Sequence, residues 1–195
     1  MNIFTKKVFD KKAQKRKSPL LFQKGLSLIE ASMVLALSAI VVSGVMYYYQ
    51  AASDNNKTQS TVSEVMSIVS AVNGLYVGTS GYKGLTGNVI MNTSAIPENY
   101  KNGTDIIHPF GGKIDIGATD NHTKYYIILN DVPQGACVNL ASMNFGTSLA
   151  GAHVGNDALQ KAKTGTLSSV NALTPEKAST LCTDKTANKI AFLLK

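Results

Sequence analysis

A long uncharged stretch is the strongest feature of the hydrophobic pattern. Residues 31–53 carry no Asp, Glu, Lys or Arg, and most positions from Ala31 to Tyr49 are apolar. A helix over 31–49 rises about 1.5 Å per residue, which brings it near the thickness of the hydrocarbon core of a bilayer. A buried core helix is the alternative, but globular cores rarely use so long a stretch without charge. We therefore expect a membrane helix.

The pattern changes after the uncharged stretch, although the helical period continues. Seven apolar residues recur at spacings of three and four: Val62, Val65, Met66, Val69, Val72, Leu75 and Tyr76. This spacing predicts one apolar stripe on a helix. The polar residues Asp54, Lys57, Ser60, Ser63, Glu64, Ser67 and Ser70 are expected on the other faces. The second half of the helix should therefore pack on a globular domain, whereas the first half must find lipid or other copies of itself.

The rest of the chain predicts an antiparallel sheet with short helices. Residues 76–112, rich in Gly, Ser, Thr and Asn, are expected to form a surface loop with brief structured pieces. Strands are expected after it at 113–118, 124–130 and 188–194. Short helices are expected at 136–144 and 174–182, the second with Thr174 as N-cap and Pro175 in its first turn. Together with the long helix, expected to end near Asn73-Gly74, these elements predict an α+β fold.

The net charge of +7 lies entirely in the first 25 residues. They hold eight of the 19 basic and one of the 12 acidic residues, so residues 26–195 hold eleven of each. A neutral body gives no electrostatic footprint for nucleic acid, which we exclude as a partner. Basic residues before the apolar run place the N-terminus in the cytoplasm, and residues 50–195 outside it.

The first 53 residues have two ordinary interpretations, a secretory signal peptide and an uncleaved membrane anchor. A secretory signal peptide has a similar start, and Ala51-Ala52-Ser53 offers a cleavage site, but this apolar run is longer than usual. An uncleaved anchor is the second interpretation. Neither accounts for Glu30, a lone carboxylate at the head of the apolar run.

The stretch Lys24–Glu30, KGLSLIE, resembles the cleavage motif of type IV pilins. In that family a membrane peptidase cuts after the glycine and methylates the new amine. The resemblance implies cleavage between Gly25 and Leu26, with Leu26 as the N-methylated mature terminus. The long leader and the first mature residue, Leu, resemble the type IVb subclass. Further segments resemble pilins of the bundle-forming kind: VMYYYQAASDNNK, NTSAIPENYK, PFGG and ACVNLASMNFGTS.

Glu30 has an independent physical interpretation. A lone carboxylate in hydrocarbon costs several kcal/mol unless it is paired or neutral. In a filament of bundled helices, one hypothesis is that Glu30 of one copy meets the Leu26 amine of its neighbour and that this pairing fixes the axial stagger. The alternative places Glu30 at the inner headgroup level, stabilised by the helix N-terminus. The resemblance to pilins favours the filament role.

Cys137 and Cys182 lack the spacing of a metal site. Because export places them in an oxidising compartment, we expect a disulfide between the two short helices. It closes a loop of about 46 residues, which contributes roughly 4 kcal/mol by chain entropy. We expect no metal, cofactor or catalytic site, since His108, His122 and His153 share no ligand spacing and no nucleophile elbow is present.

The expected product is therefore the major subunit of a type IVb pilus, with the type IV pilin fold and no enzymatic activity. Its domains are a removed leader (1–25), a membrane and filament-core helix (26–49) and an exported domain (50–195). Within the last lie the amphipathic helix 50–75 and the disulfide region 137–182. The resemblance implies polymerisation with copies of itself, contact with the peptidase and inner-membrane assembly machinery, and adhesion, bacterial aggregation and bundle formation. The precursor is expected in the inner membrane and the product in surface pili. A minor pilin or pseudopilin, and a non-polymerising anchored binding domain, are the alternatives.

Overall fold

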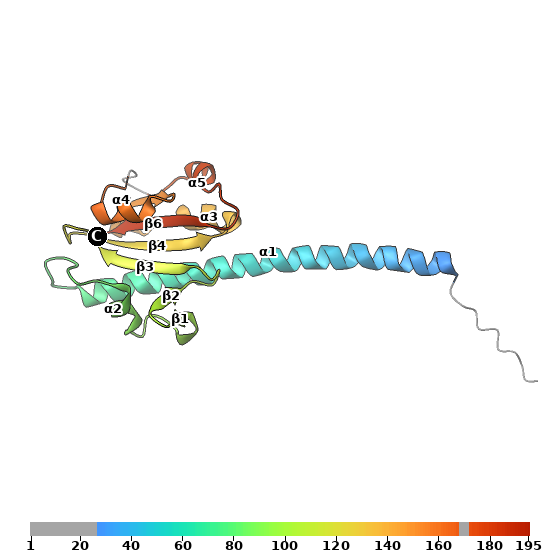
Figure 1. Ribbon diagram of the computed structural model, residues 1–195, viewed down its shortest axis with the longest axis horizontal. Coiled ribbons are helices and arrows are strands. Elements are labelled where there is room, and N and C mark those ends of the chain that lie inside the picture. The colour runs from blue at the N-terminus through green and yellow to red at the C-terminus, as the bar shows by residue number, and fades with distance from the viewer. Residues whose placement is uncertain (1–26, 168–171) are drawn as a thin grey trace, which may run out of the picture. The chain divides into compact units, whose positions relative to one another are not determined.

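The long helix α1 (Leu28–Leu75) is the first element that the structure describes (Figure 1). The computed structural model describes residues 27–167 and 172–195. Its contacts divide the chain between Gly44 and Val45, so α1 starts in one unit and ends in the other. We call residues 28–44 the apolar half of α1, and residues 45–195 the body.

A six-stranded antiparallel sheet forms the centre of the body. Its strands are β1 (Lys101–Asn102), β2 (Asp105–Ile107), β3 (Lys113–Ala118), β4 (Tyr125–Val132), β5 (Leu149–Val154) and β6 (Asn188–Leu194). They lie in the order β1-β2-β3-β4-β6-β5, and every neighbouring pair is antiparallel. The last strand, β6, is an interior strand between β4 and β5. Its five residues from Ile190 to Leu194 are all buried, because both faces of the sheet are covered there.

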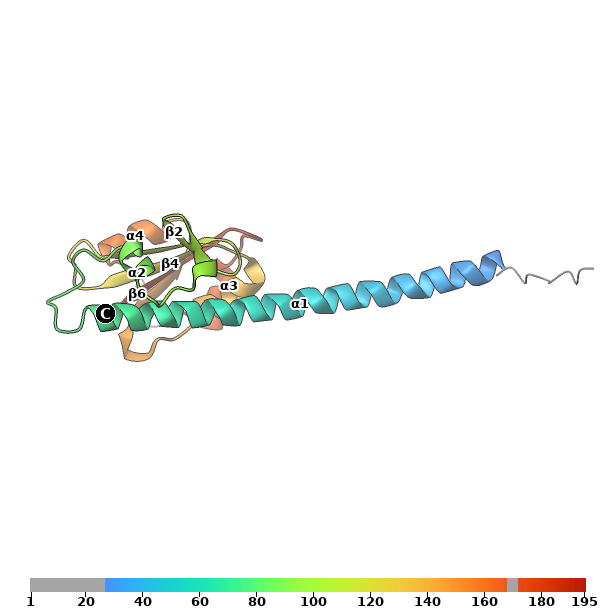
Figure 2. The same ribbon diagram turned by 90° about the horizontal axis from the view of Figure 1, so that it is seen from below.

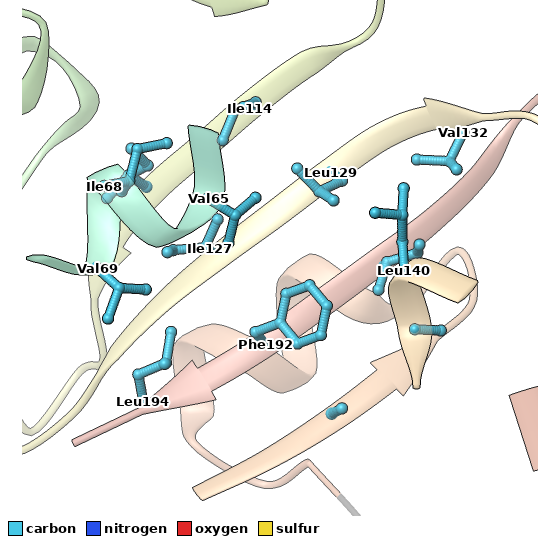
Figure 3. Close-up of a cluster of buried hydrophobic side chains, with 14 of the residues drawn as sticks. Val65, Ile68, Val69, Ile114, Ile127, Leu129, Val132, Leu140, Phe192 and Leu194 are labelled. Atoms are coloured by element: carbon cyan, nitrogen blue, oxygen red, sulfur yellow. The ribbon is translucent and has the colours of Figure 1, made fainter. Parts of the chain in front are cut away.

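Helices cover both faces of this sheet. On one face, the part of α1 within the body packs its side chains against β3, β4 and β6 (Figures 2 and 3). The residues in this contact include Val65, Ile68, Val69, Ile114, Ile127, Leu129 and Phe192. On the other face, α4 (Ala158–Thr164) sets Ala158 and Ala162 against a second cluster that contains Tyr126, Ile128 and Leu193. Small alanines let this short helix approach the strands closely.

The strongest sequence patterns match the observed elements. β3 and β6 have the expected bounds, and β4 begins one residue later and ends two residues later than expected. Helices α3 (Gln134–Ala141) and α5 (Pro175–Leu181) lie where short helices were expected. The Thr174 hydroxyl accepts a hydrogen bond from the backbone N–H of Lys177, as an N-cap does.

The body contains short elements whose positions the sequence did not give. The loop 76–112 was expected to hold brief structured pieces, and these are α2 (Gly87–Met91) and the two strands β1 and β2. Both β5 and α4 lie in the segment between the cysteines, where no element was expected. β5 reads LAGAHV, and its small residues have weak strand propensity, so pairing with β6 rather than local preference establishes it. Among the described residues there are also two single turns of 3-10 helix, Glu98–Tyr100 and Gly146–Ser148.

The apolar stripe of α1 is correct in period but displaced in phase. The buried residues of α1 are Thr61, Glu64, Val65, Ile68, Val69 and Val72. Met66 and Leu75, which were expected in the stripe, are about half exposed. Glu64, expected on a polar face, faces the interior instead. The helix has taken the rotation that buries Ile68 and Val72 completely, and this rotation brings Glu64 inward.

Candidate functional site

The apolar half of α1 exposes almost all of its side chains. Leu28, Leu35 and Ile40 are 90, 71 and 70% exposed, and the most apolar 18-residue window of the helix contains no buried residue. By length and composition α1 can cross a membrane. A helix with this surface needs lipid or other apolar helices around it.

The polar groups within this half are satisfied by the helix itself. The hydroxyls of Ser32, Ser38 and Ser43 donate to backbone carbonyls three or four residues earlier, at 2.7–2.8 Å. Such bonds remove the need for water around a serine in an apolar environment. The exposed surface is therefore effectively apolar along its whole length, with Glu30 as its one carboxylate.

Glu30 lies in the first turn of α1 and is exposed. Within the described part of the chain it forms no ion pair. Gly25 and Leu26, where cleavage and methylation are expected, lie outside the described residues. Glu30 is thus at the tip of an apolar surface, and its pairing with a Leu26 amine stays a prediction.

The structure contains a disulfide between Cys137 and Cys182. Cys137 lies in α3 and Cys182 directly follows α5, and both side chains are buried. The Cα atoms are 5.9 Å apart, within the usual range for a disulfide, and 45 positions separate the residues. The amide of Gln134 donates to the carbonyl of Cys182 at 3.0 Å, which adds a second link between the two helices.

Residues 50–195 match the family model for bundlin. The chain belongs to the bundlin family. Two Escherichia coli relatives, from O127:H6 strain E2348/69 and from O111:H-, are each named the major structural subunit of bundle-forming pilus. Each is 48% identical over 191 residues, spanning 89% of this chain and 95% of the relative.

The fold of this bundlin-family chain is the type IV pilin fold. A crystal structure of TcpA, a type IV pilin from Vibrio cholerae El Tor biotype, superimposes with a TM-score of 0.51. It is 16% identical in sequence and covers 72% of this chain and 99% of TcpA. The long N-terminal helix, the antiparallel sheet and the disulfide-bounded C-terminal segment agree with the fold expected from the sequence.

His108 has a structural role that its sequence context does not reveal. It lies in the loop between β2 and β3, and only 2% of it is exposed. Nδ1 accepts from the backbone N–H of Phe110 at 3.3 Å, so Nε2 carries the proton and donates to the carbonyl of Asn130 at 2.7 Å. Burial lowers the pKa of His108, which keeps the ring neutral. His108 therefore joins the loop before β3 to the end of β4.

The other two histidines have local structural environments. His153 shares a hydrogen bond of 2.8 Å with Asp157, and His122 occupies a left-handed turn position. The described residues contain no group of three or more His, Cys, Asp or Glu side chains that could hold a metal ion.

Glu64 is the second residue whose environment the sequence did not reveal. Its side chain is 4% exposed, and neither carboxyl oxygen has a hydrogen-bond partner among the described residues. Burial raises the pKa of Glu64 to about 8. The carboxyl group is therefore largely protonated at neutral pH. Its only sequence signal is its spacing of four from Ile68, which is shared by many exposed glutamates.

Proposed function

We propose that this chain is the major structural subunit of a type IVb pilus and that it polymerises through residues 26–49. The observation that carries the proposal is the apolar half of α1, which is exposed on all sides and has no apolar partner in the described chain. Identical helices from other copies supply such a partner outside the membrane, where single helices would otherwise face water.

Three processing and assembly steps belong to this proposal. A prepilin peptidase removes residues 1–25 by cutting between Gly25 and Leu26, and the Leu26 amine is methylated. The carboxylate of Glu30 then pairs with the Leu26 amine of the neighbouring subunit, so that each added copy neutralises one buried charge. The precursor lies in the inner membrane with its N-terminus in the cytoplasm and its body in the periplasm. Assembly machinery of the inner membrane extracts it into the fibre.

The fibre presents the body outward, and we propose that it mediates adhesion to host or bacterial surfaces, aggregation and bundle formation. The naming of the two Escherichia coli relatives supports the bundle-forming role. The disulfide supports the outward display, because it ties down the segment that carries β5 and α4 in an oxidising environment.

Mass spectrometry of material sheared from the cell surface tests the proposal in one experiment. The expected product begins at Leu26, carries one methyl group on its amine, and contains the disulfide. Recovery of abundant fibres built from this product supports a major subunit. Sheared fibres that contain only traces of the chain would indicate a minor pilin. An intact, membrane-retained chain that keeps residues 1–25 would refute polymerisation.

A further inference from the structure

Glu64 borders a cavity on the surface of the body. The cavity lies between α1 and residues 95–100, has a volume of about 220 Å³, and is lined in part by Ser60, Ser63, Ser67, Pro97 and Tyr100. A second hollow continues it along α1 past Ser67 and Ala95. We call the first cavity the Glu64 groove. It combines a carboxyl group, four hydroxyl-bearing side chains and a small apolar wall.

The carboxyl group of Glu64 lacks the cation that a buried acid usually requires. No described residue forms a salt bridge with it. Lys57, two turns earlier on α1, lies over the ring of Phe110 at 5.9 Å, and Lys101 pairs with the exposed Glu98 at 2.6 Å. An acid without a partner lowers the stability of the single subunit, so the fold gains nothing from Glu64 by itself.

The acidic and basic residues of the body are unevenly distributed along the chain. Residues 45–136 hold five basic and seven acidic residues, a balance of −2, whereas residues 137–195 hold six basic and three acidic residues, a balance of +3. The Glu64 groove is bordered by the segment that leads into β1, at one edge of the sheet. The basic residues of segment 137–195, which we call the basic part, lie in α4, α5, β6 and the loops beside them. A segment with net positive charge and a groove with an unpaired acid, on the same chain, favour contact between two copies.

We propose that the Glu64 groove receives a lysine side chain from residues 137–195 of a second copy, with Glu64 as its counter-ion. The inference rests on the proposed function, because it requires that copies polymerise. A butylammonium group is small enough for the volume of the groove, and serine hydroxyls can accept its remaining N–H bonds. On docking, the Glu64 side chain rotates toward the mouth of the groove and releases its proton to solvent, while the ammonium keeps its protons.

Such a contact is heterologous, so each added copy leaves one groove and one lysine free for the next copies. It therefore suits an open polymer rather than a closed dimer. Four exposed lysines of the basic part, outside any ion pair among the described residues, are the candidates: Lys163, Lys177, Lys185 and Lys195.

The first test compares Glu64→Gln with Glu98→Gln in a bacterium that assembles the parent chain into fibres. Glu64→Gln keeps the shape of the side chain and removes an unpaired buried acid, so the subunit should remain at least as stable as the parent. Sheared fibre protein, relative to total subunit, should nevertheless fall about tenfold or more, since the interfacial ion pair is lost. Glu98→Gln alters an exposed carboxylate near the same groove and should leave fibre yield unchanged. Equal yields for Glu64→Gln and the parent overturn the inference.

The second test changes each of the four candidate lysines to Gln, alone and combined with Glu64→Gln. One lysine variant should reproduce the loss of fibres, and its double variant should be no worse than either single one, because both remove the same pair. If no lysine variant lowers the yield, or if the losses multiply, the inference is wrong. These results differ from failure of the proposed function, in which the parent chain itself yields no fibres.

Discussion

Ile40 and Ile68 lie on the same helix in opposite environments. Ile40, in the apolar half of α1, is 70% exposed, whereas Ile68, in the body, is completely buried against the sheet. Both are part of a continuous hydrogen-bonded helix, so secondary structure does not distinguish them. What differs is the surrounding sequence: apolar on every face around Ile40, and apolar along one stripe around Ile68. A striped helix can be completed by its own chain, while a helix apolar all round needs partners from outside it.

The largest effect on fibre assembly is expected from a change of Glu30, the carboxylate of the apolar half of α1. Glu30→Gln keeps the size of the side chain and removes its charge. We expect subunit level, processing and membrane insertion to stay normal, and fibre yield to fall by at least about tenfold because an interfacial ion pair is lost. Quantification of sheared fibres against total subunit measures this. Normal fibres from Glu30→Gln would refute the pairing of Glu30 with the Leu26 amine.

The disulfide tests whether the body depends on its own cross-link. Cys182→Ser removes the cross-link and so increases the conformational entropy of the unfolded chain. The free energy of unfolding of the body should therefore be about 4 kcal/mol lower than in the parent. Denaturant unfolding of the purified full chain in detergent measures the change. The variant with both cysteines replaced by serine is the control, and its loss should equal that of the single variant. Parent-like stability would contradict a stabilising role.

A matched pair of substitutions tests directly whether the apolar half of α1 and the body differ. Ile68→Ala leaves a cavity between α1 and the sheet, and should lower the free energy of unfolding of the body by about 2–5 kcal/mol. Ile40→Ala makes the same chemical change on an exposed surface and should alter it by less than about 0.5 kcal/mol. Fibre yield at equal subunit level should fall for Ile40→Ala if that surface packs in a polymer. Equal effects of both variants on unfolding would show that the two halves do not differ.

The hydrophobic periodicity predicted the long helix and the main strands because each of these segments carries a regular apolar pattern. Residues 113–116 alternate between more exposed and buried positions, and residues 190–194 form a buried apolar run. β5 and α4 were missed because small residues carry no periodic signal, and their places depend on pairing with β6 and on the close approach of Ala158 and Ala162. Long-range contacts of this kind are not encoded in a local window.

Some residues of the candidate site were likewise predictable from the sequence, and others were not. Cys137 and Cys182 were predictable because export and an even cysteine count leave one pairing. The burial of His108 and Glu64 was not predictable, since each depends on tertiary packing. His108 is buried by a loop that reaches Asn130, and Glu64 by the rotation of α1 that inserts Ile68 and Val72 into the core. A polar residue next to an apolar stripe has two candidate faces, and the sequence does not choose between them.

The smallest expected effect concerns Glu64 and pH. Burial raises the pKa of Glu64 from 4.5 to about 8, so between these values the folded state holds a proton that the unfolded state has released. Stability contributed by the protonated form is complete below pH 4.5 and is lost as pH rises toward 8, by at most about 1.4 kcal/mol per pH unit. The actual slope should be well below this limit, because the side chain borders a cavity and can turn toward water once ionised. Glu64→Gln removes the titrating group and should flatten the dependence, which denaturant unfolding at several values between pH 5 and pH 8 measures. A slope that persists unchanged in Glu64→Gln would assign it to another group and would leave the burial of Glu64 without energetic consequence.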